Sequence, residues 1–119
     1  MNNTLAPSPY SFAGEIVEAF GPEVQEKDIA AALWYYTRED LKKILRLAET
    51  NIAAATDELL EARRVADQEF GEGWKVKVLY YRDRKNIRPL EKRGLTCEQD
   101  GILQYWFIPV RKNRKENQQ

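Results

Sequence analysis

The sequence predicts an α+β fold, with helices in the first 70 residues and a three-stranded antiparallel sheet after them. The range 23–70 contains neither Gly nor Pro, which is unusual for loops and natural for helices. Beyond Gly71, apolar and polar residues alternate over short stretches, as they do in half-buried strands. The length of 119 residues fits one domain. We place this domain at 11–111, between a loose tail at 1–10 and a basic tail at 112–119.

Two short helices are expected before residue 37. Ser11 is a suitable N-cap for the first helix, and Gly21-Pro22 ends it. The second covers about 24–36 and finishes in the aromatic triplet 34–36, while a similar triplet, 105–107, lies in the last expected strand. Each triplet is too dense for one buried face. The rings therefore either fill the junction between helices and sheet or contact a partner.

A third helix is expected over 38–69, because apolar residues recur there at alternating steps of four and three. This heptad seam consists of Leu41, Leu45, Ala48, Ile52, Ala55, Leu59, Ala62 and Ala66. A continuous helix would be about 48 Å long, whereas a compact domain of this size is only about 35 Å across. The helix must either protrude and pair with a second copy or bend at Thr50-Asn51, where both residues favour helix ends. We favour the unbroken helix and a homodimer that uses the seam as its interface.

The rest of the chain is expected to form three strands. The first, at 74–81, alternates apolar and polar residues. The polar run 82–86 is interpreted as a hairpin turn, and 87–90 as a short return strand at an edge of the sheet, because Pro89 has no N–H to donate. After a second turn, the third strand covers 102–110.

The missing residue types exclude several classes of function. The chain has no His, so it cannot form a Ser-His or Cys-His nucleophile pair or a His-ligated zinc site. Its one cysteine, Cys97, lies between the expected strands, and its acidic neighbours Glu98 and Asp100 should raise the pKa of the thiol. We expect no catalytic residues, no cofactor and no metal site. The apolar runs are too short to cross a bilayer and the first residues do not resemble a signal peptide, so we expect a cytoplasmic location.

Charge is sorted along the chain. Residues 1–70 hold thirteen acidic and seven basic side chains, and residues 71–119 hold six acidic and twelve basic, so the two parts carry −6 and +6. The candidate nucleic-acid-binding residues are the cations Lys75, Lys77, Arg82, Arg84, Lys85, Arg88, Arg111 and Lys112. If they share the face of these lysines, the aromatic rings of Tyr81, Tyr105 and Phe107 would stack on single-stranded bases.

Other interpretations of these charges stay open. The cations can belong to a solvated sheet face whose edge lysines prevent unwanted pairing. The acidic helices and basic hairpin can also face each other and specify assembly. The range 27–45 superficially resembles a helix-turn-helix, but its turn would hold three bulky aromatic residues. The carboxylates near Glu61 alternate with arginines, which is typical of a solvated helix face.

Taken together, these patterns favour a small non-enzymatic protein-interaction module, an adaptor or regulator that forms a homodimer through the long helix and binds another protein. This prediction depends on the seam, the surplus aromatic residues and the missing catalytic chemistry. The alternative is a nucleic-acid-binding regulator that uses the basic hairpin and the C-terminal tail.

Overall fold

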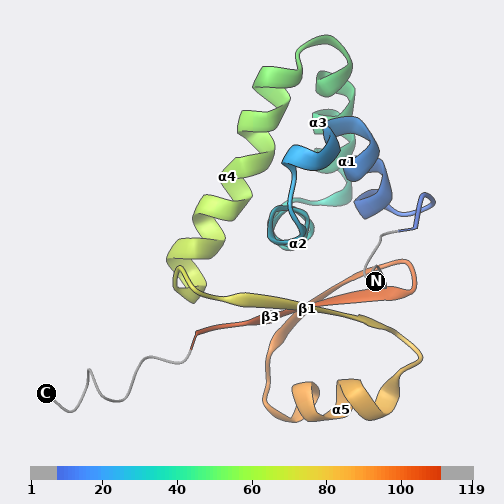
Figure 1. Cartoon of the computed structure of the whole chain (residues 1–119), viewed down its shortest axis with the longest axis vertical. Coiled ribbons are helices and arrows are strands. Elements are labelled where there is room, and N and C mark those ends of the chain that lie inside the picture. Colours follow the sequence, from blue (N-terminus) through green and yellow to red (C-terminus); the bar gives the residue numbers. More distant parts are fainter. Residues whose placement is uncertain (1–7, 111–119) are drawn as a thin grey trace, which may run out of the picture.

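The computed structural model describes residues 8–110, and the α+β class is confirmed (Figure 1). The elements in chain order are α1 (Phe12–Phe20), a 3₁₀ turn η2 (Gly21–Glu23), α2 (Glu26–Tyr35), α3 (Arg38–Thr50), α4 (Ile52–Phe70), β1 (Lys75–Tyr80), α5 (Arg84–Lys92), β2 (Thr96–Asp100) and β3 (Leu103–Ile108). Most of the expected tail at 1–10, and all of that at 112–119, lie outside the described residues.

The sheet is antiparallel, with β3 at its centre and strand order β1-β3-β2. Val78 pairs with Tyr105 across β1 and β3, and Cys97 pairs with Trp106 across β2 and β3. Because β1 and β2 both run antiparallel to β3, they run parallel to each other, and such a connection needs a crossover segment. That segment contains α5, which covers one face of the sheet while α1–α4 lie on the other (Figure 1).

Two apolar clusters hold these three layers together. On the side of α1–α4, Trp74, Tyr105 and Phe107 are buried against the helices. On the opposite side, Trp106 is buried under two residues of α5, which are Ile87 and Leu90. Successive residues of β3 therefore point into different clusters, which explains why this strand is apolar on both faces.

The expected unbroken helix over 38–69 is wrong. Helix α3 ends at Thr50, and α4 begins after Asn51. The side-chain oxygen of Asn51 accepts a hydrogen bond from the N–H of Ala54 at 3.1 Å. This is an N-cap, which satisfies one of the free N–H groups at the start of a helix. The chain then reverses, so that α4 runs back beside α3 and also packs against α2 (Figure 1).

The bend changes what the heptad seam contacts. Five of its eight residues are buried within one subunit, namely Leu41, Ala55, Leu59, Ala62 and Ala66. Leu45 and Ala48 are partly buried, and Ile52 is 48% exposed at the start of α4. The seam thus joins helices of the same chain, and its buried residues are not accessible to a second copy in this fold.

The expected turn at 82–86 and return strand at 87–90 are also wrong, because this range forms α5. Ile87 and Leu90 are three residues apart and point to the same side of a helix, with charged residues around them. Pro89 is tolerated because it lies on the exposed side, where the carbonyl of Lys85 that loses its helical partner is accessible to water. The second strand is instead β2, which contains Cys97, while the expected third strand at 102–110 includes β3.

Candidate interaction surfaces

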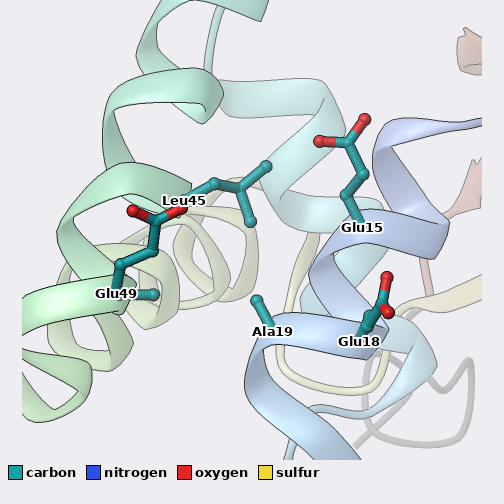
Figure 2. A pocket seen from close by; sticks show the side chains of 6 residues that line it. Glu15, Glu18, Ala19, Leu45 and Glu49 are labelled. Atoms are coloured by element: carbon teal, nitrogen blue, oxygen red, sulfur yellow. The ribbon is translucent and has the colours of Figure 1, made fainter.

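A hollow of about 360 Å³ lies between α1 and α3 and forms the first candidate surface. Its lining comes from residues spaced three and four apart on the two helices, which are Glu15, Glu18, Ala19, Leu45, Ala48 and Glu49. Figure 2 shows Leu45 of α3 and Ala19 of α1 pointing toward the space between the helices, with carboxylates on both sides. We call this hollow the α1/α3 groove.

The α1/α3 groove combines an apolar floor with an acidic rim. Glu15, Glu18 and Glu49 are exposed, and none of them forms an ion pair within residues 8–110. Among the residues that the structure describes, no basic side chain lines the groove. Such a surface favours a partner that brings positive charge and an apolar side chain together.

Sequence patterns identified only part of this groove. Leu45 and Ala48 were expected in an interface because they belong to the seam, and they are the seam residues that the bend leaves facing the groove. The three α1 residues were missed because they precede Leu45 and Ala48 by about thirty positions. The only sequence signal for them is that Glu15 and Glu18 lie on the polar side of an otherwise apolar helix.

The second candidate surface is basic and lies on the α5 side of the sheet. Arg84, Lys85 and Arg88 are exposed on α5, and Arg82 is exposed just before it. Lys75 and Lys77 are exposed on β1 and alternate with residues that face the helices, so they share the α5 side with Leu79. Arg111 and Lys112, which belong to the same predicted group, both lie outside the described residues.

The basic region of the sequence also includes Lys92, the last residue of α5, and Arg93, its C-cap. The correction of a hairpin to a helix changes how the cations of this region are placed. A helix carries Lys85, Arg88 and Lys92 on one side, whereas a hairpin would have separated them. These three side chains and Pro89 border a hollow of about 640 Å³ on the outer side of α5.

The aromatic triplets mostly fill the junction between helices and sheet. The Trp34 ring lies 5.2 Å from that of Phe70 and 5.9 Å from that of Phe107, measured between ring centres. Tyr105 is 1% exposed and Phe107 is fully buried, so neither provides a platform for bases. Of the three expected platforms only Tyr81, 51% exposed, is accessible.

The acidic and basic parts of the chain do not neutralise each other through ion pairs in the described range. Arg63 bridges Asp28 and Asp67 at 3.1 and 3.2 Å, and Arg64 pairs with Glu61 one turn away. These pairs lie within α2 and α4, while the pair Arg84–Glu91, at 3.1 Å, lies within α5. No ion pair in residues 8–110 joins the acidic part to the basic part.

The thiol of Cys97 is partly buried under α5, and its pKa is raised to about 11. Burial is the largest cause, followed by the negative charges of Glu98 and Glu91. The pKa is therefore raised, as predicted, but burial contributes more than the charge of Glu98, and the second acid that acts on the thiol is Glu91 and not Asp100. A thiol of this kind is a poor nucleophile at neutral pH.

Within the described part of the chain, no group of three or more His, Cys, Asp or Glu side chains is arranged to hold a metal ion. Over the same residues, no helix combines the length and the apolar character needed to cross a membrane. Comparisons with protein families, with curated proteins and with solved structures found no match for this chain. The two surfaces therefore carry the functional argument alone.

Proposed function

We propose that this chain is a small non-enzymatic protein-interaction module, an adaptor or regulator, which binds a basic amphipathic helix of another protein in the α1/α3 groove. The observation that carries the proposal is the set of three rim carboxylates without ion pairs around the apolar floor. The aromatic triplets no longer support it, because they lie mainly in the junction between helices and sheet.

The walls of the groove favour a helical occupant. Both walls are α-helices, whose backbone groups bond internally, so they offer no free edge to an added strand. A helix can place one apolar side chain against Leu45 and Ala48. Lys or Arg three or four positions away would then reach Glu15 on one wall and Glu49 on the other.

The predicted homodimer is part of the same proposal, in a reduced form. A second copy would have to use the accessible end of the seam, which consists of Leu45, Ala48 and Ile52. A dimer and a basic partner helix would therefore compete for the α1/α3 groove.

The test compares two variants of equal charge. Glu15→Lys with Glu49→Lys reverses the rim, while Glu69→Lys with Glu72→Lys makes the same change in total charge at exposed positions elsewhere. The probe is a fluorescent 15-residue peptide of Leu and Lys at helical spacing, measured by anisotropy at low and physiological salt. We expect the rim variant to lose binding and the control to retain it.

Equal loss in both variants would contradict the proposal, because attraction would then depend only on total charge. Light scattering across a range of protein concentrations completes the test. A dimer that the rim variant disrupts would make a second copy the occupant of the groove, in place of a different protein.

A further inference from the structure

Helix α5 is the one helix of the described chain that lies on its side of the sheet (Figure 1). Its inner side is fixed by Ile87 and Leu90, which are buried against Trp106. Within residues 8–110, no other element covers its outer side, which carries the cations that border the 640 Å³ hollow. The helix is thus anchored to the sheet by one side and presents the other to solvent.

The cations of this outer side are regularly spaced. Lys85 and Lys92 are seven residues apart, which places them on the same side of the helix about 10 Å from each other along its axis. Arg88 lies between them, within the same third of the circumference. Within residues 8–110, none of the three forms an ion pair.

The surroundings of α5 add further positive charge. Residues 71–110 contain eight basic side chains, and Lys75 and Lys77 of β1 share the α5 side of the sheet. The same range contains five acidic side chains, so its net charge is +3. Glu91 offsets Arg84, with which it is paired, and Asp100 is buried at the N-terminus of α1 on the other side of the sheet.

We propose that the outer side of α5, with Lys75 and Lys77 beside it, binds the phosphate backbone of double-stranded nucleic acid. This surface is separate from the α1/α3 groove, and the inference does not depend on the proposed function. Each strand of a duplex presents one phosphate per roughly 3.4 Å of the helix axis, so about three phosphates of one strand lie along the 10 Å stripe on α5. Three regularly spaced cations without ion pairs in the described range suit such a row.

Two further observations favour a duplex over a single strand. Single-strand binding adds stacking on exposed aromatic rings. Here Tyr105 and Phe107 are buried on the opposite side of the sheet, which leaves Tyr81 as the one accessible ring of the predicted three. The negative charge of residues 8–70 also lies beyond the sheet, and it therefore orients the molecule with α5 toward a polyanion.

The experiment measures binding of a labelled 24-base-pair DNA duplex of mixed sequence by anisotropy, from 25 to 300 mM salt. The test variant is Lys85→Gln, Arg88→Gln, Lys92→Gln. The matched control is Lys42→Gln, Lys43→Gln, Arg46→Gln, which removes three exposed cations from α3. Trp106 lies under α5, so tryptophan fluorescence and thermal melting report whether α5 remains packed.

We expect the full chain to bind with a steep salt dependence, and the α5 variant to bind roughly tenfold or more weakly at the lowest salt. The slope of log K against log salt should become shallower by about 2.7, because each lost phosphate contact contributes about 0.9. The α3 control should keep both affinity and slope. If the α5 variant fails to fold, Lys75→Gln with Lys77→Gln tests the same surface and should weaken binding in the same direction.

Four results would overturn the inference. No binding at 25 mM salt would remove it altogether. Loss of binding in the α3 control but not in the α5 variant would transfer the activity to the helix pair that resembles a helix-turn-helix. Tighter binding of a single strand of the same length, or equal binding of polyglutamate, would exclude recognition of a duplex backbone.

Discussion

Asp100, the last residue of β2, accepts a hydrogen bond from the backbone N–H of Ala13 at 2.9 Å, through a carboxylate that is buried. The other oxygen accepts from the N–H of Phe12 at 3.2 Å. These N–H groups belong to the first turn of α1 and have no partner within the helix. A residue 87 positions away thus caps α1 and connects it to the edge of the sheet.

Replacing Asp100 should therefore destabilise the whole domain. Asp100→Ala leaves two N–H groups of α1 without a partner and removes a negative charge from its positive end. We expect the free energy of unfolding to fall by about 2–3 kcal/mol, as is typical for hydrogen bonds to a charged group. Urea denaturation measures the change. Asp100→Asn keeps one acceptor oxygen and should lose about half as much, whereas an unchanged midpoint for Asp100→Ala would contradict this role.

Gly14 should be intolerant of a methyl group. A Cβ at this position would lie 1.9 Å from the carbonyl oxygen of Ser8 and 2.8 Å from the Cα of Pro9. Helix propensity alone predicts that Gly14→Ala stabilises α1 by about 1 kcal/mol. We expect the opposite sign, a loss of about 1–3 kcal/mol, because backbone atoms must move. Deleting residues 1–9 should reverse the sign of the stability change that Gly14→Ala causes. Thermal unfolding of the full and the shortened chain, each with and without the substitution, measures this coupling.

Cys97 should react slowly with a thiol reagent until the domain unfolds. Its pKa of about 11 in the folded protein exceeds the ordinary value of 9.0, so the thiol stays protonated near pH 8. Folding favours the neutral thiol, and this contribution to stability is complete below pH 9 and is lost as the pH rises from about 9 to 11. The rate of iodoacetamide labelling against pH checks the value. A labelling midpoint near 8.5 in the native protein would contradict it.

Glu98→Gln should stabilise the protein at neutral pH. Burial raises the pKa of the Glu98 carboxyl, so the folded protein binds its proton more tightly than the unfolded chain does. The favourable contribution is present below the ordinary pKa of 4.5 and is lost as the pH rises through the folded value. We expect a gain of less than about 1 kcal/mol at pH 7, because the side chain keeps contact with water.

That gain should disappear at pH 3, where the carboxyl is protonated in both states. Exposed Glu72→Gln is the control and should show neither effect. Because the charge of Glu98 also raises the pKa of Cys97, the same variant should accelerate labelling of the thiol. The stability at pH 3 and pH 7 and the labelling rate are independent readouts. A loss of stability at pH 7 would contradict the raised pKa of the Glu98 carboxyl.

Much of the fold was predictable from the sequence because it depends on local patterns. The helical half follows from the absence of Gly and Pro over 23–70 and from the seam. The sequence marked Thr50-Asn51 as the place where the helix could bend, but it did not decide between a bent and an unbroken helix, because the four-three spacing continues across Asn51 without a gap. The segment after Asn51 folds back because α2 provides a surface against which α4 packs. Such a contact between distant parts of the chain is a tertiary property that local patterns do not reveal.

The errors around α5 have a different cause. Between Arg82 and Arg93 the only aliphatic residues are Ile87 and Leu90, and their spacing of three is helical. The exposed Pro89 suggested an edge strand instead. Strand β2 contains few apolar residues, since it lies at an edge and pairs with β3 alone. The cations of the second surface could therefore be identified by residue type. That three of them share one side of α5 could be deduced only once this range was known to be a helix.

Ala62→Leu distinguishes the observed role of the seam from the role first expected for it. Ala62 is fully buried in α4, and the facing helix α2 contains three more fully buried alanines, at 30, 31 and 32. Small residues on both helices allow their backbones to approach closely, so a larger side chain has no space. We expect a loss of about 1–3 kcal/mol in the free energy of unfolding, from overpacking.

A dimer seam would respond in the opposite way. In a coiled coil, Leu at this position would bury more apolar surface between two copies and strengthen their association. Urea denaturation at two protein concentrations separates the cases. A lower stability that does not depend on concentration fits helix packing within one subunit, because dissociation is not part of its unfolding. A higher stability that rises with concentration would return Ala62, Ala55 and Ala66 to an interface between copies.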